Sequence, residues 1–322
     1  MSETALAETP LDELVDDVAD RTDEEPESIR RRLDPFTDDG TVTSAAIEST
    51  VTDVSQILAT AETRVDLATR AHEKATGAAA AAPDLAVVDA RRRGFDGRLS
   101  DLRAGVDGLA EELGDARGDF DSPLAVYRAA VALHEITTDA QQIVRVAHDL
   151  ETDLEAFEAW LGSANRRHDG LLDDVEAAEE SVAEVTGTVD ALRDADDPDP
   201  ERWFEAAVQA RVLDLVVDDL RVEAADLRTW ADRQGHSFPD GVAERIDALD
   251  DEAAATAEAL ADRPGRDDRF DDRLDALEAE LSAIEPPVAW ERVDETVAEA
   301  RAALSAGEPD ADGGSVDETA DR

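Results

Sequence analysis

Cysteine is absent from the 322 residues, and lysine, asparagine, methionine and tyrosine occur once each. Without cysteine the chain forms no disulfides and uses no thiolate chemistry. The longest uncharged run, residues 75–83, is mostly alanine and falls short of the ~18 apolar residues that a membrane helix requires. The first ten residues contain acidic side chains and no apolar run, so we expect no signal peptide. These absences predict a soluble, cytoplasmic protein with no membrane span.

Acidic residues dominate the composition: 82 Asp and Glu against 31 Lys and Arg give a formal net charge of -51. Such acid-rich, lysine-poor and alanine-rich usage is typical of proteins in molar potassium salt, where a Debye length of about 3 Å screens repulsion between the charges. Hydrophobic residues make up 42% of the chain and recur at helical spacing, which disfavours intrinsic disorder. The charge therefore predicts a halophilic environment and says little about partners.

The strongest pattern is an apolar row that runs from Ser122 to Leu161. Its members follow one another in steps of three and four: Val126, Ala129, Leu133, Ile136, Ala140, Ile143, Ala147, Leu150, Leu154, Phe157 and Leu161. The row predicts one helix about 60 Å long, begun by a serine cap and a first-turn proline. A second, largely uncharged row passes through Tyr127, His134 and His148. Two apolar rows predict the interior helix of a bundle, with these three side chains packed.

Similar rows recur along most of the chain, and no segment shows sustained period-two alternation. The predicted class is all-α, with long antiparallel helical hairpins in a coiled-coil-like bundle. A second broad-faced helix is expected from Trp203 to about Arg233. The predicted parts are a small helical N-terminal head at 1–43, a long-helix bundle at 44–195, a second helical segment packed on it at 196–305, and a disordered acidic tail at 306–322.

The sequence contains no Walker loop, no dinucleotide-binding glycine run and no nucleophile elbow. His134 and His148 are separated by about 21 Å along one helix, so they cannot share a metal ion. Asp38 to Val42 resembles part of a calcium loop, but Ala46 stands where the bidentate glutamate is needed. We therefore expect no catalytic residue, no cofactor and no metal site, and a protein that is not an enzyme.

Arginine clusters occur at Arg30–Arg32, Arg91–Arg93 and Arg166–Arg167. The first is the candidate interaction site, Arg30, Arg31 and Arg32, because it lies on the second of two short helices that could form a helix-turn-helix. The competing interpretation is that these arginines pair with nearby acids, since phosphate binding requires a positive field. Arg92 interrupts the apolar row of its helix, so the second cluster is expected to pair with acids across a helix interface.

Three short motifs carry a resemblance to other sequences: Leu33-Asp34-Pro35, the segment from Asp38 to Thr43, and Ala61-Glu62-Thr63-Arg64. With them the chain resembles haloarchaeal helical proteins labelled "halo transducer protein". The resemblance implies a cytoplasmic haloarchaeal protein named by analogy with coiled-coil signal transducers. The sequence departs from chemotaxis transducers, since the single paired glutamine, Gln141-Gln142, lacks the surrounding pattern of a signalling tip.

These observations predict a non-enzymatic coiled-coil scaffold or interaction protein, which the resemblance relates to signal transduction. Its partner would be another protein or a second copy, bound through exposed helix seams. The alternative is a DNA-binding regulator whose head contacts DNA while the long helices dimerise. The acidic surroundings of Arg30–Arg32 disfavour nucleic acid as a partner.

Overall fold

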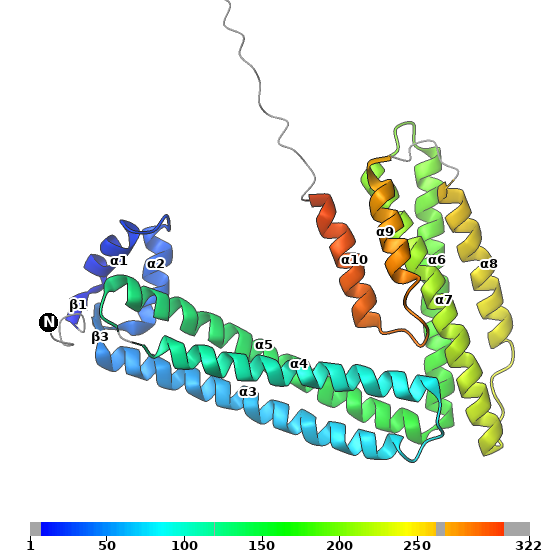
Figure 1. Ribbon diagram of the computed structural model, residues 1–322, viewed down its shortest axis with the longest axis horizontal. Coiled ribbons are helices and arrows are strands. Elements are labelled where there is room, and N and C mark those ends of the chain that lie inside the picture. The colour runs from blue at the N-terminus through cyan, green and yellow to red at the C-terminus, as the bar shows by residue number, and fades with distance from the viewer. Residues whose placement is uncertain (1–7, 119, 262–267, 306–322) are drawn as a thin grey trace, which may run out of the picture. The chain divides into compact units, whose positions relative to one another are not determined.

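A computed structural model describes residues 8–118, 120–261 and 268–305 (Figure 1). The described residues fall into two compact units. The first unit contains those within 1–82 and 92–159, and the second contains those within 83–91 and 160–322. The division near residue 160 therefore falls inside the expected 44–195 segment. The expected tail at 306–322 lies outside the described residues.

The first unit begins with the head, residues 8–43. Its elements are β1 (Glu8–Pro10), α1 (Leu11–Ala19), α2 (Pro26–Leu33), η1 (Asp34–Phe36), β2 (Thr37–Asp38) and β3 (Thr41–Thr43). The strands form an antiparallel sheet in the order β1-β3-β2. Asp39 and Gly40 join β2 to β3 with positive φ angles of 48° and 76°, as a two-residue hairpin turn requires. Strands of two or three residues are too short to show an alternating pattern, so the sequence did not predict them.

Three long helices follow the head: α3 (Ser44–Ala79), α4 (Ala86–Ala116) and α5 (Pro123–Gly162). The Thr43 hydroxyl starts α3 by accepting a hydrogen bond from the amide of Ala46 at 3.1 Å. The Ser122 hydroxyl starts α5 in the same way, at 3.2 Å from the amide of Ala125. Both satisfy helix amides that have no partner inside the helix. The single helix predicted from Ser122 to Leu161 is confirmed.

Figure 1 shows α3, α4 and α5 running alongside one another in the first unit. Side-chain pairs define the direction in which they run. His72 of α3 lies 2.6 Å from Asp96 of α4, and Arg117 near the end of α4 bonds Ser55 early in α3 at 2.7 Å. Phe95 and Phe157 bring α4 and α5 together with ring centroids 5.3 Å apart. Partners late in one helix and early in the next show that α3 and α4 are antiparallel.

The second unit contains α6 (Ala164–Asp194), α7 (Pro200–Gln234), α8 (Val242–Ala261), η2 (Asp268–Phe270), α9 (Asp271–Leu281) and α10 (Trp290–Ser305). Asp199 caps α7 through the amide of Glu201, and Gly235 ends it with φ 70°. α7 packs against α6, α8 and α9, and its buried residues include Trp203, Phe204 and Trp230. The broad apolar face predicted for this helix is confirmed.

Helices account for nearly all regular structure among the described residues, which confirms the all-α class. None of the described helices combines the length and the apolar character needed to cross a membrane. The expectation of two packed rows along α5 is wrong beyond its first turns. Tyr127 is buried, whereas His134 and His148 are exposed. The second row is therefore mixed: Val131 and Val144 are half-buried, and its histidines face solvent.

Candidate functional site

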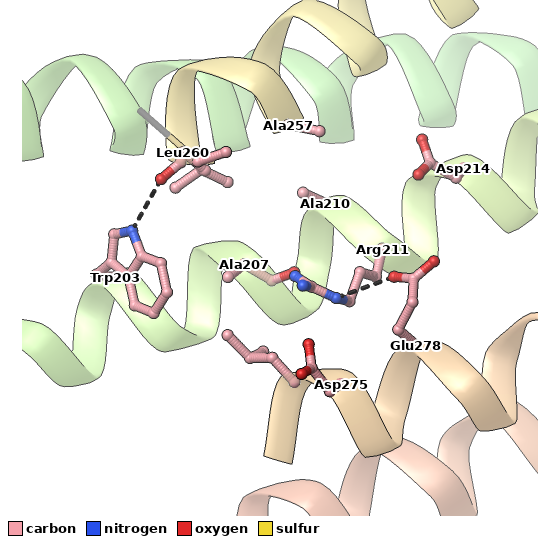
Figure 2. A pocket seen from close by; sticks show the side chains of 11 residues that line it. Trp203, Ala207, Ala210, Arg211, Asp214, Ala257, Leu260, Asp275 and Glu278 are labelled. Carbon is pink, nitrogen blue, oxygen red and sulfur yellow. Dashed lines mark hydrogen bonds and ion pairs between the residues drawn. The ribbon is translucent and has the colours of Figure 1, made fainter. Parts of the chain in front are cut away.

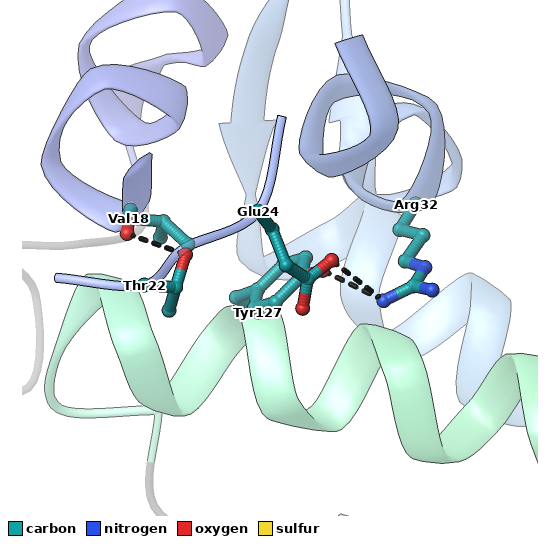
Figure 3. Close-up of polar contacts among 5 residues, drawn as sticks. All are labelled: Val18, Thr22, Glu24, Arg32 and Tyr127. Carbon is teal, nitrogen blue, oxygen red and sulfur yellow. Dashed lines mark hydrogen bonds and ion pairs between the residues drawn. The ribbon is translucent and has the colours of Figure 1, made fainter. Parts of the chain in front are cut away.

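Arg32 holds the head against the start of α5 (Figure 3). Its guanidinium donates to Glu24 at 3.0 Å and to the Tyr127 hydroxyl at 2.8 Å. The same hydroxyl donates to Glu24 at 2.5 Å. Tyr127 is 3% exposed, and burial, followed by its hydrogen bond to Glu24, raises the pKa of its phenol. The Arg32 guanidinium is therefore bound by partners within the protein.

The other two arginines of the predicted site differ from each other. Arg30 pairs with Asp12 at 2.6 Å. Arg31 is exposed and has no ion-pair partner among the described residues. The head contains 13 acidic residues against four arginines. The expected pairing of these arginines with acids is therefore confirmed for Arg30 and Arg32. Arg31 remains as an exposed cation surrounded by acidic residues.

Arg91 links α4 to α7 in the second unit. It donates to Glu223 at 2.8 Å, and its guanidinium lies 4.4 Å from the ring centroid of Trp160. The predicted pairing of its cluster with acids across a helix interface is confirmed for this residue. Nearby, Asp219 accepts hydrogen bonds from the amide of Val288 at 2.8 Å and the indole of Trp290 at 3.1 Å. Asp219 thus joins α7 to the segment that begins α10.

Burial raises the pKa of Glu223 and, independently, that of Asp219. For Glu223 the Arg91 cation acts in the opposite direction, yet desolvation of its side chain, 12% exposed, is the larger effect. The folded protein therefore binds protons at these two carboxyls more tightly than the unfolded chain does. Buried carboxyls of this kind occur in catalytic sites and in structural networks alike, and these two are engaged by structural partners.

We expect the raised pKa of Glu223 to make stability fall as the pH rises. The stabilising contribution is complete below the ordinary pKa of 4.5 and is lost as the pH rises through the raised folded value. Urea unfolding in molar KCl at several pH values measures this slope, and Glu223→Gln should reduce it.

Glu179→Gln is the matched control for that measurement. Hydrogen bonds from Arg245 lower the pKa of Glu179, so its contribution is present above its ordinary pKa and is lost as the pH falls. The control should therefore leave the Glu223 slope in place. An unchanged slope in Glu223→Gln would show that this carboxyl does not govern it.

Arg167 is the buried cation that the sequence did not reveal. It lies near the start of α6, is 2% exposed, and donates to the carbonyls of Trp160 and Leu161 at 3.1 and 2.9 Å. It also donates to Gln234 at 2.9 Å and stacks 3.8 Å from the ring centroid of Trp230. Burial lowers the pKa of its guanidinium. The side chain therefore satisfies the last carbonyls of α5, where the helix dipole is negative.

A cavity of about 180 Å³ lies between α7, α8 and α9 (Figure 2). Its lining consists of Trp203, Ala207, Ala210, Arg211, Asp214, Ala257, Leu260, Ala261, Leu274, Asp275 and Glu278. Arg211 pairs with Glu278 at 3.0 Å, and the Trp203 indole donates to the Leu260 carbonyl at 3.3 Å. Burial and the neighbouring carboxylates raise the pKa of Asp214, although its exposed side chain is partly screened by water. The guanidinium of Arg211 and the indole N–H of Trp203 therefore already have partners within the protein.

Among the described residues, no three His, Asp or Glu side chains are placed to hold a metal ion. His72 is half-buried against Asp96. His168 packs edge-on against Phe238 with ring centroids 5.4 Å apart, and burial, followed by the charge of Arg167, lowers its pKa. Comparison with protein families, curated proteins and solved structures finds no match for the chain.

Proposed function

We propose that the protein is a non-enzymatic helical scaffold that binds protein partners. One observation carries the proposal: the Tyr127 contact with Arg32 and Glu24 fixes the head to a bundle of long helices. α3 alone spans about 54 Å at 1.5 Å per residue. A head fixed on coiled-coil-like helices of this length presents surfaces at defined separations, which is what a scaffold must do.

Capture in molar KCl with the intact chain as bait tests the proposal. Tyr127→Ala should release the head from α5 and lose a partner that contacts both. Thr138→Ala is the control, since Thr138 is exposed on the same helix and donates only to the carbonyl of His134. The proposal predicts a reproducible partner with the wild type and the control and none with Tyr127→Ala. Failure of the wild type to retain any protein would contradict it.

A second candidate function, DNA binding by the head, is favoured by its element order. α1 and α2 are followed by the β2–β3 hairpin, so α2 would be the recognition helix and the hairpin would lie beside it. The exposed cation available for a base or phosphate contact on α2 is Arg31. If the head binds duplex DNA, Arg31→Ala should weaken binding about tenfold, at 1–3 kcal/mol per good contact.

Arg30→Ala is the control for the DNA experiment, because Arg30 is already paired with Asp12. Binding is measured by fluorescence anisotropy at several KCl concentrations, since phosphate contacts make affinity salt-dependent. Wild-type protein that leaves duplex DNA unbound at every concentration would eliminate this candidate and leave the scaffold proposal unaffected.

A further inference from the structure

The cavity between α7, α8 and α9 has an apolar floor and a charged rim (Figure 2). The buried part of its lining is entirely apolar and consists of Trp203, Ala207, Ala210, Leu260 and Leu274. The exposed part of its lining includes three carboxylates, those of Asp214, Asp275 and Glu278. A molecule in this cavity would therefore meet apolar atoms in its depth and acidic groups where it opens to solvent.

The charges of the rim are not balanced. Arg211 is the cation of the lining, and Glu278 pairs with it at 3.0 Å. Neither Asp214 nor Asp275 has an ion-pair partner among the residues that the structure describes. Burial, followed by the charge of Glu278, raises the pKa of Asp214 more than the Arg211 cation lowers it. A further cation at the rim would stabilise the charged form of this carboxyl.

The volume and shape of the cavity limit what can enter it. At about 180 Å³, it is slightly larger than a cavity of about 150 Å³ that accommodates a benzene ring in another protein. It therefore has room for a small molecule only. Trp203 and Ala210 lie seven residues apart on α7, about 10 Å along the helix axis. An apolar floor of this length suits an extended chain better than a compact ring.

We propose that this cavity binds a small linear aliphatic amine, with its alkyl chain on the apolar floor and its ammonium group at the rim that carries Asp214 and Asp275. Burial of the alkyl chain stabilises the complex, and the two carboxylates select a positive charge. A carboxylate ligand would be repelled by the rim, and a neutral alcohol would leave its charge unbalanced. The inference goes beyond the scaffold proposal, since Tyr127 belongs to the first unit and the cavity to the second.

Three probes with the same alkyl chain test the selection of charge: n-hexylamine, n-hexanol and hexanoate. Near neutral pH the amine is protonated, as a lysine side chain is. Isothermal titration calorimetry of the intact chain in molar KCl compares their affinities. Hexylamine should bind about fivefold more tightly than hexanol, because a direct ion pair at an exposed rim has an effect of this order. Hexanoate should bind more weakly than either.

Variants of the lining place the binding in this cavity. Asp214→Asn should weaken hexylamine about fivefold and leave hexanol unchanged. Asp232→Asn is the control, because Asp232 is an exposed carboxylate of α7 outside the lining, and it should change neither affinity. Ala257→Leu, at a half-buried position of the lining, should fill part of the cavity and weaken both ligands, while an unchanged helical signal in circular dichroism shows that the variant folds.

Absence of hexylamine binding, or binding that Ala257→Leu leaves intact, would overturn the site. Equal affinities for hexylamine and hexanol, or equal effects of Asp214→Asn and Asp232→Asn, would overturn the selection of a cation. Capture of a protein partner does not depend on these variants, so failure of the amine site and failure of the scaffold proposal are distinguishable.

Discussion

Replacing Arg167 with alanine is expected to destabilise the second unit by about 2–4 kcal/mol. The guanidinium satisfies the carbonyls of Trp160 and Leu161, and its plane covers the ring of Trp230. Alanine leaves these buried acceptors without a donor and opens a cavity beside the indole. Urea unfolding at constant KCl concentration measures the change in the free energy of unfolding.

Arg166→Ala is the matched control, because Arg166 is the exposed neighbour of Arg167 and has no side-chain ion pair among the described residues. It should change stability by less than about 0.5 kcal/mol. Arg167→Met separates packing from hydrogen bonding, since it retains most of the side-chain volume and no donors. Equal unfolding free energies for Arg166→Ala and Arg167→Ala would contradict the role assigned to the buried guanidinium.

Lowering the salt concentration is expected to have the largest effect of all, loss of most helical structure. At about 0.1 M salt the Debye length is about 10 Å, compared with about 3 Å at 1 M. Carboxylates on neighbouring helices then repel one another. Burial raises the pKa of Asp214 most, and the charges of Glu278 on α9 and Asp250 on α8 raise it further, which is the sign of such repulsion. Circular dichroism during dialysis from molar KCl to dilute buffer should record a cooperative loss of helix.

The control for desalting separates charge screening from other effects of salt. Acidification of the desalted protein neutralises carboxylates, so it should restore helical signal if repulsion is the cause. A helical signal that survives dialysis unchanged would show that packing alone holds the helices together. In that case the net charge would not govern stability.

Periodicity predicted the helices well because long helices repeat their buried row many times. The single helix at α5 and the broad face of α7 both followed from apolar residues at steps of three and four. The head strands were missed because two or three residues carry no periodic signal. The packing predicted for His134 and His148 is wrong because uncharged side chains on a second row do not reveal how many neighbours the helix has.

Side-chain chemistry was less predictable than helix positions. Nothing near Arg32 in the sequence indicates Tyr127, which lies 95 residues away. Arg166 and Arg167 are adjacent in one cluster, yet the structure exposes the first and buries the second. Arg167 lies four residues before Leu171, so it falls on the buried side of α6, whereas Arg166 does not. The apolar row that begins at Leu171 could therefore have predicted the burial of Arg167.

Capture in molar KCl with the wild type, Tyr127→Ala and Thr138→Ala as baits tests the central claim most directly, that a head fixed to α5 by Tyr127 is needed to hold a protein partner. The account predicts the same partner with the wild type and with Thr138→Ala, which changes an exposed position of the same helix. Recovery should fall about tenfold or more with Tyr127→Ala. Equal recovery by Tyr127→Ala and the wild type would contradict the claim.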